Sequence, residues 1–444
     1  MQLMMKKMTD NKKPATIRNA LAVATSSLLA APAHAVEEGE AATQWEVDSS
    51  ILYYDEQDRV RVIKPVLSAR SEIGEERFLN VRAVFDTMTG ASPNGAAPSS
   101  QPQTFTTPSG RESYTVRPDK YPMRNFEDNR VAASVTLETP VSRLVKAVLG
   151  LNGSVESDYI ALGGSAMLAK DINNRLTTLS TGIAVSYDLI RPDSAIPQGL
   201  GVMTSSSAAS MRSASDDDDE EDDDDEGDDG ERKVVVDLLF GITQVVNKRT
   251  VSQLNYTLGF SNGYLTDPYK IISRVDGTSG LPVDYLYEKR PGTRLRNSLY
   301  WHTAHQFNED SIHFAYRFFW DDWGITAHTA DVKYRFELGS GHYLQPHIRY
   351  YTQTAADFYR HSLVSGESTP RYASADLRLA EFVSTTLGIK YGMPLLDGEL
   401  SMRIEQMRQQ GESHPGDAVG DLKNRDLFPT LEAAIVQLSY SFIF

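Results

Sequence analysis

The chain ends in the stretch LEAAIVQLSYSFIF, residues 431–444, which alternates apolar and small polar side chains along most of its length. Successive side chains of a β-strand point to opposite faces, so one face of this segment is apolar and the other polar. The apolar face holds Ala434, Val436, Leu438, Tyr440, Phe442 and Phe444. A strand of about 9 to 11 residues with one apolar face is what crosses the bilayer in a β-barrel. The segment is therefore predicted to span a membrane.

A second segment, residues 326–338, places ionised side chains opposite apolar ones. A packed soluble core does not accept a row of ions without close pairing, whereas the wet lumen of a membrane barrel does. The same alternation recurs in three further segments. The charges predicted to face the lumen are Arg317, Asp331, Lys333, Arg335, Glu337, Arg349, Arg403 and Glu405. Because their signs are mixed, these charges do not indicate which ions the lumen would prefer.

Segments of this kind recur about 16 times from residue 44 onward, an even number, as in single-chain bacterial barrels. The predicted strands cover residues 45–54, 59–69, 77–86, 129–139, 144–152, 159–169, 175–189, 233–246, 250–260, 294–307, 311–320, 325–338, 343–354, 377–391, 399–408 and 431–444. The fold class is thus all-β. We expect a transmembrane antiparallel up-and-down β-barrel over residues 44–444, with long extracellular loops.

The lengths of the connections indicate which way this barrel faces. Periplasmic turns of such barrels are short and extracellular loops are longer, in alternation. The long connections all follow odd-numbered strands, and they cover residues 87–128, 190–232, 261–293, 355–376 and 409–430. With the N-terminus in the periplasm, these connections are predicted to be extracellular. Phe444 then ends the last strand on the periplasmic side, where it resembles the signal that the barrel-assembly machinery reads.

The N-terminus carries the marks of export. Basic residues precede the apolar run 20–31, and the small residues Ala33 and Ala35 follow it at signal-peptidase spacing. The run is shorter than the ~20 residues of a membrane-spanning helix. Residues 1–35 are therefore predicted to be a cleaved signal peptide, and residues 36–43 a short periplasmic segment. The chain contains no cysteine, which excludes disulfides, a lipoprotein anchor and thiol chemistry.

The acidity of the chain is local. Residues 216–231 hold 14 acids in 16 positions, and without them the formal charge of −16 becomes −2. The wider segment 205–231 is too polar to bury a core, so we expect a disordered acidic insertion in an extracellular loop. We interpret it as a solvated tract, with loose capture of cations as the alternative. A chain this acidic is also a poor candidate for binding nucleic acid.

The nearest approach to a catalytic arrangement is the turn at residues 321–324, followed by His328, with His302 and His305 possibly nearby. An Asp and a His at a barrel rim could activate water or hold a metal ion. However, Asp-x-x-Gly is ordinary turn chemistry, and His328 falls on the lipid-facing side of its strand. The sequence has no nucleophile-elbow, phosphate-loop, dinucleotide or haem-attachment motif. The chain is predicted not to be an enzyme and to use no cofactor or metal.

Four phrases of the sequence resemble those of a known family. They are TGASPNG at 89–95, GYLTDPYK at 263–270, DDWGI at 321–325 and RYYTQTAADFY at 349–359. They resemble an uncharacterised outer-membrane β-barrel family of Gram-negative bacteria, domain of unknown function 3570, from about residue 45 to the C-terminus. The acidic run departs from the family's pattern. The resemblance implies the barrel fold and a link to periplasmic redox or flavin-related proteins, but it assigns no residue.

These phrases share a place in the predicted topology. Each lies at or beyond the outer end of an odd-numbered strand, so they should converge around the extracellular mouth. The candidate rim consists of Tyr264, Asp267, Asp321, Asp322, Trp323, Asp357, Phe358 and Tyr359. We hypothesise that this rim is the working site, for gating or ligand capture, as a packed ring or an inward-folded plug. The alternative is that its aromatic residues form only the interfacial girdle of the barrel.

Taken together, the sequence favours an integral outer-membrane barrel that acts as a channel or transport component for small polar solutes or ions. A first alternative is a structural or docking barrel of an envelope redox or flavoprotein system. A second alternative is a hydrolase with its site at the rim. The expected partners are outer-membrane lipid and lipopolysaccharide, with the barrel-assembly machinery during biogenesis.

Overall fold

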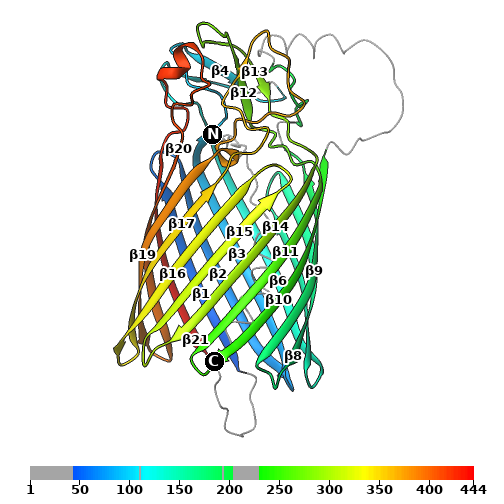
Figure 1. The fold of residues 1–444 in the computed structure, drawn as a ribbon, viewed down its shortest axis with the longest axis vertical. Coiled ribbons are helices and arrows are strands. Elements are labelled where there is room, and N and C mark those ends of the chain that lie inside the picture. Colours follow the sequence, from blue (N-terminus) through cyan, green and yellow to red (C-terminus); the bar gives the residue numbers. More distant parts are fainter. Residues whose placement is uncertain (1–43, 110–111, 193–194, 204–229) are drawn as a thin grey trace, which may run out of the picture.

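The computed structural model describes residues 44–109, 112–192, 195–203 and 230–444. Within them, strands close into one antiparallel barrel in which each strand pairs with its neighbours in chain order (Figure 1). The barrel strands are β1 (Trp45–Glu56), β2 (Val60–Gly74), β3 (Arg77–Pro93), β6 (Met123–Ser142), β7 (Val145–Val155), β8 (Tyr159–Ile172), β9 (Thr177–Ile190), β10 (Glu231–Asn247), β11 (Thr250–Gly263), β14 (Thr293–Gln306), β15 (Ser311–Asp321), β16 (Thr326–Gly339), β17 (His342–Gln353), β19 (Phe382–Leu395), β20 (Gly398–Gly411) and β21 (Leu431–Ile443).

The C-terminal strand β21 closes this barrel. β21 pairs with β1 in a register that sets Val436 opposite Tyr53. The pairing continues to the chain end, where Trp45 N donates to Phe444 O at 2.8 Å and Phe444 N donates to Trp45 O at 3.0 Å. The sheet has no free edge at this seam, which a strand in lipid requires because unpaired backbone groups find no water there.

The alternation of side chains places apolar residues on the outer face of the barrel and polar residues on its inner face, which is the reverse of a soluble protein. On β17, Ile348 and Tyr350 are exposed on the outer face, while His347 and Gln353 face inward and are buried. Large apolar residues are exposed in this way on every barrel strand from β1 to β21 except β15, where they are only partly exposed. Such an outer surface suits lipid. Among the described residues, no helix is long and apolar enough to span a membrane.

Each predicted strand overlaps one barrel strand, and the barrel holds sixteen strands as expected. Most real strands run past their predicted ends, most of all β3 and β6, which stay paired as far as Pro93 and Met123. Backbone pairing continues there after the lipid-facing pattern has stopped. One strand start was wrong: Leu377 lies in a 3-10 helix, and β19 begins at Phe382.

Some predicted features lie outside the described residues. These are the signal peptide, the segment 36–43 and the acidic insertion up to residue 229. At the far end of that predicted insertion, Glu231 belongs to β10 and not to the insertion.

The remaining elements lie together at one end of the barrel, opposite the C-terminus (Figure 1). They are β4 (Gln103–Thr106), β5 (Ser113–Val116), β12 (Ile271–Val275), β13 (Pro282–Tyr287), β18 (Leu363–Val364), and the short helices η1 (Leu377–Leu379) and η2 (Gly420–Asn424). β4 and β5 form a hairpin, while β12 pairs with β13 and with β18. We call this assembly of long loops the crown.

Candidate functional site

The loop between β11 and β14 is the centre of the crown, and we call it the hub loop. Its Ile271 N donates to Asn94 O of the β3–β6 loop at 2.9 Å. Its Ser279 O accepts from Asp421 N of the β20–β21 loop at 2.8 Å. Val275 of the hub loop packs in one buried cluster with residues of both partner loops. The hub loop therefore joins two loops that are far apart in the sequence.

The roots of these loops lie far apart around the barrel wall. Between the β11–β14 pair and the β3–β6 pair stand four strands on one side, β7 to β10, and eight on the other. Four strands also separate the β11–β14 pair from the β20–β21 pair on the shorter side. Loops rooted so far apart on a closed wall meet only by crossing the opening. The crown therefore spans the mouth of the barrel.

A second set of contacts fastens the hub loop to the β17–β19 loop. Lys289 and Ala373 exchange backbone hydrogen bonds of 2.9 and 3.0 Å. Ile272 and Leu286 of the hub loop pack with Ala373 and Ala375 in a fully buried cluster. Apolar side chains thus point into the crown, as in the core of a soluble domain.

The Trp323 turn, between β15 and β16, docks the β17–β19 loop onto the barrel. Trp323 is buried, its Nε1 donates to Thr293 O at 2.9 Å, and its ring meets Phe358 edge-on at 5.1 Å. Asp357 N donates to Trp323 O at 2.9 Å. Gly324 has a φ of +84°, and a Cβ there would collide with the carboxylate of Asp357. Glycine is required on both counts.

Buried charges link the hub loop to the β17–β19 loop at the centre of the crown. Arg290 Nε lies 2.7 Å from Glu288 Oε1, and Arg290 Nη2 lies 2.8 Å from Asp376 Oδ2. Arg378 reaches Asp376 at 2.5 Å and Asp267 at 2.9 Å. Glu288 and Asp376 are almost completely buried. We call these five residues the crown ion network. Removing one partner would leave another charge buried without compensation.

Two carboxyl groups of the network are shifted in opposite directions. Burial raises the pKa of Glu288, and the opposing effect of Arg290 does not cancel it. Burial would also raise the pKa of Asp376, but Arg378, Lys270 and Arg290 together hold it well below its usual range. Desolvation lowers the pKa of Lys270, whose Nζ donates to Pro93 O. The network is thus built around an ionised Asp376.

The structure divides the candidate rim residues among three places. Asp322, Trp323, Asp357, Phe358 and Tyr359 gather at the Trp323 turn, where Asp321 also accepts from Arg294. Asp267 belongs to the crown ion network, and Tyr264 packs over the ends of β8 and β9. Trp323 of this turn and Phe358 of the β17–β19 loop are both buried, whereas the residues of an interfacial aromatic girdle face the membrane surface.

The central residues of the crown ion network were not predicted from the sequence. Glu288, Arg290, Asp376 and Arg378 were not among the candidate residues. A usable signal was present, because each loop carries an acid and an arginine two positions apart, Glu288-x-Arg290 and Asp376-x-Arg378. Asp376 also accepts from Arg378 N at 3.1 Å, and so caps η1 where a strand was predicted.

The predicted lumen charges do face inward, and several of them form a second network on β16, β17 and β20. His347 Nε2 lies 2.8 Å from Asp331 Oδ2, and its Nδ1 lies 2.8 Å from Glu405 Oε1. Arg349 is 3.7 Å from Asp331, and Arg403 is 3.6 Å from Glu405. Carboxylates only accept hydrogen bonds, so a protonated imidazolium satisfies both contacts of His347.

The other predicted lumen charges continue this wall. Lys333 lies 3.7 Å from Asp331, Arg335 pairs with Glu337, and the Arg317 guanidinium lies 5.6 Å from the ring centroid of Tyr300 on β14. These contacts run obliquely along the inner face of β14 to β20. A solute in the lumen would meet ions along much of this wall.

The residues weighed for catalysis are not assembled into one site. The Asp321 carboxylate is occupied by Arg294 and by backbone N–H groups of its own turn. His328 faces outward, where its Nδ1 lies 2.7 Å from the Tyr316 hydroxyl, whereas His302 stacks on His313 inside the lumen. Within the described ranges, no group of three or more His, Asp or Glu side chains is arranged to hold a metal ion.

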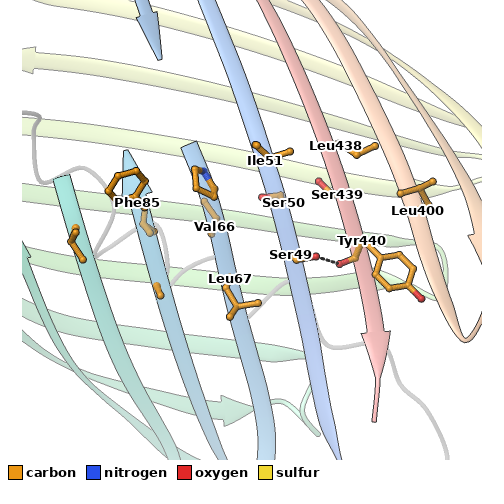
Figure 2. Close-up of a pocket in the computed structure, with 14 residues that line it drawn as sticks. Ser49, Ser50, Ile51, Val66, Leu67, Phe85, Leu400, Leu438, Ser439 and Tyr440 are labelled. Atoms are coloured by element: carbon orange, nitrogen blue, oxygen red, sulfur yellow. Dashed lines mark hydrogen bonds between the residues drawn. The ribbon is translucent and has the colours of Figure 1, made fainter. Parts of the chain in front are cut away.

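A groove of 540 Å³ crosses the closure between β1 and β21 (Figure 2). Its walls are mainly apolar and include Ile51, Leu67, Phe85 and Leu438, all on the outward-facing side of their strands. The small side chain of Ser49, whose hydroxyl donates to Tyr440 O at 3.1 Å, leaves room for the groove between these apolar residues. This groove belongs to the lipid-contacting surface and is separate from the lumen.

One family model matches most of the chain. A family model described as a protein of unknown function, DUF3570, matches residues 18–442. No curated protein matches the sequence.

Solved structures that match share the barrel architecture alone. The outer membrane protein opdK of Pseudomonas aeruginosa aligns with a TM-score of 0.39 and 9% identity, over 91% of this chain and 99% of that one. OccK2 (OpdF) of the same organism gives 0.36 and 10%, over 90% and 98%. The ferric enterobactin receptor PfeA, also from Pseudomonas aeruginosa, gives 0.41 and 9%, over 91% of this chain and 60% of the receptor.

Proposed function

We propose that this chain, which belongs to the DUF3570 family of unknown function, is a gated outer-membrane channel for small polar solutes or ions. The lumen is the path and the crown is the gate. The observation that carries this proposal is the row of ionised side chains along the inner wall, from Arg317 on β15 to Glu405 on β20. Such a row of ions avoids a large desolvation cost only where the lumen beside it holds water.

The crown suits a gate because it crosses the mouth and is held by contacts that can open without breaking the barrel. Its loops meet through apolar clusters and the crown ion network. The barrel strands keep all their hydrogen-bonded neighbours whether these loops touch or not. Closed and open states can therefore exchange over one intact scaffold.

The proposal places the crown, the candidate rim and the acidic insertion on the extracellular side. The short turns and Phe444 then lie in the periplasm. Lipid and lipopolysaccharide would cover the apolar outer face, and the barrel-assembly machinery would read the β21 end during insertion. Periplasmic redox or flavin-related proteins would approach the end with the short turns, as partners of a conducting barrel.

The test is planar-bilayer recording of the purified protein and of Asp376→Asn. Removing one partner from a buried ion pair costs about 3–5 kcal/mol, which is about two or more orders of magnitude in the equilibrium between closed and open crown. We expect brief, rare steps of current from the wild type and long open periods from the variant. The single-channel conductance should be the same once either is open.

The matched control is Asp119→Asn in the β3–β6 loop. Asp119 pairs with Arg425 at 2.5 Å, but its carboxylate is largely exposed, and such pairs contribute about 0–1 kcal/mol. This variant should behave as the wild type. If Asp376→Asn inserts as a folded barrel and passes no current, the proposed channel is wrong.

A further inference from the structure

The inner wall of β15 to β20 carries more positive than negative charge. Its cations form what we call the basic strip: Arg317, Lys333, Arg335, Arg349, Lys390 and Arg403. The acids among them are Asp331, Glu337, Glu399 and Glu405. One further acid, Asp321 at the crown end, is paired with Arg294 of β14. Six cations thus stand against four acids below that turn.

Around His347, the cations of this wall are more exposed to the lumen than the acids. The side chains of Arg349 and Lys333 are 51% and 38% exposed, whereas those of Asp331 and Glu405 are 16% and 7% exposed. His347 lies between these two carboxylates and draws both against the wall. At this level of the strip, a solute therefore meets guanidinium and ammonium groups before it meets carboxylates. Glu399, beside the β19–β20 turn, is the exception at 42%.

An aromatic platform holds the lower part of the strip in place. Tyr343 lies flat in the space that Gly392 leaves on the neighbouring strand, where a Cβ would collide with its ring. The Arg335 guanidinium lies 3.5 Å from the centroid of that ring, and Lys390 Nζ lies 5.3 Å from it. The aromatic face thus holds both cations in position beside their acids, Glu337 for Arg335 and Glu399 for Lys390.

Another wall also carries inward-facing cations, but it groups them around shared acids. On β2, β3 and β6, Lys64 and Arg130 both bind Asp86, at 3.1 and 2.6 Å. Glu138 likewise lies near Arg70 and pairs with Lys146 at 3.0 Å. Those cations and acids are arranged in compact groups, whereas the basic strip presents its cations along a continuous line.

We infer that the channel prefers small anions and that the basic strip on β15 to β20 is their path. This inference rests on the proposed function and names its solute class. Charges of one sign on the wall of a narrow, low-dielectric passage raise the local concentration of counter-ions and repel ions of like sign. Asp331 and Glu405 add no opposing barrier, because His347 and their cationic neighbours occupy their oxygens.

The test is the reversal potential of the full-length protein in a bilayer between concentrated and dilute KCl. Asp376→Asn serves as a second conducting form of the same chain. We expect chloride to be several-fold more permeant than potassium in both. The triple change Lys333→Gln, Arg349→Gln and Lys390→Gln should abolish or reverse this preference without abolishing conduction.

Lys64→Gln is the matched control for Lys333→Gln. It removes one inward lysine from another wall, where Asp86 keeps Arg130 as its partner, and it should leave the permeability ratio close to that of the wild type. Lys333→Gln alone should lower the ratio.

Each other outcome is decisive. A conducting protein that selects cations, or neither ion, overturns the anion preference and leaves the channel standing. Anion selectivity that survives the triple change overturns the assignment to the basic strip. If neither the wild type nor Asp376→Asn conducts, the proposed channel fails and this inference fails with it.

Discussion

The crown and the barrel are built from one chain on opposite packing rules. The crown buries apolar side chains such as Ile272 and Leu286 inside itself, as a soluble domain does. The barrel exposes residues such as Ile348 to lipid and turns charges such as Arg349 inward. Two surroundings explain the difference, because apolar side chains are buried from water in the crown and face lipid on the barrel.

This difference means that the two regions can be disturbed separately. Each barrel strand is held by backbone hydrogen bonds to both neighbouring strands. These bonds do not depend on any side chain of the crown. The crown is held by a limited set of clusters and ion pairs between loops. A change in the crown core should therefore loosen the contacts between the crown loops and leave the wall intact.

The largest effect is expected from Trp323→Ala. Removing a large buried aromatic side chain costs about 3–5 kcal/mol, and here the loss weakens the docking of the β17–β19 loop onto the barrel. Limited proteolysis of the protein in liposomes should then cleave the β17–β19 loop, while the heat-induced shift of the folded barrel on gels stays unchanged. Trp301→Ala is the control, since Trp301 lies on the outer face of β14. If Trp323→Ala unfolded the barrel as well, the separation would be wrong.

A pair of neighbouring residues tests the barrel side of the comparison. Ile348→Arg puts a charge on the lipid face near the middle of β17, which costs about 2–4 kcal/mol. Arg349→Ile, one residue further on, changes only the lumen and should alter stability much less. Urea unfolding in lipid vesicles measures both. Equal losses would mean that the two faces are not solvated differently.

The barrel could be predicted from the sequence because each strand carries its own signal. Lipid and water impose a period of two on every spanning segment, as in residues 326–338, and this signal is local. All sixteen strands were located for that reason. Strand ends such as Pro93 were missed, because hydrogen bonding continues beyond the membrane without a period in the side chains.

The crown could not be predicted in the same way, because its contacts join residues that no local pattern relates. Arg290 and Asp376 are 86 residues apart, and Ile271 meets Asn94 across the mouth. The sequence did place the candidate rim residues at one end, through the order of the strands. It assigned Leu377 to a strand, because a short apolar run looks alike in a strand and in a capped turn.

A smaller effect within the crown is expected from Gly324→Ala. Its positive φ alone costs an alanine about 1–2 kcal/mol, and the new Cβ meets the Asp357 carboxylate. The double variant with Asp357→Ala removes the collision but keeps the backbone cost, so it should recover part of the loss. Protease susceptibility of the β17–β19 loop measures each step. A double variant no better than Gly324→Ala would show that the carboxylate does not limit this turn.

The smallest effect is the response of the closed crown to mild acid. An acid whose pKa is depressed in the folded state stabilises that state above its unfolded pKa, and this stability is lost only as pH falls through the folded value. The pKa of Asp376 is held well below its usual range. In an unfolded chain, the pKa of an Asp side chain is about 3.9. The pKa of Glu288 is raised, so its protonation on acidification favours the folded crown. Open probability in a bilayer should therefore not increase from about pH 7 to pH 5 and should rise only below about pH 4. Opening between pH 7 and 5 would show that a group other than Asp376 holds the gate.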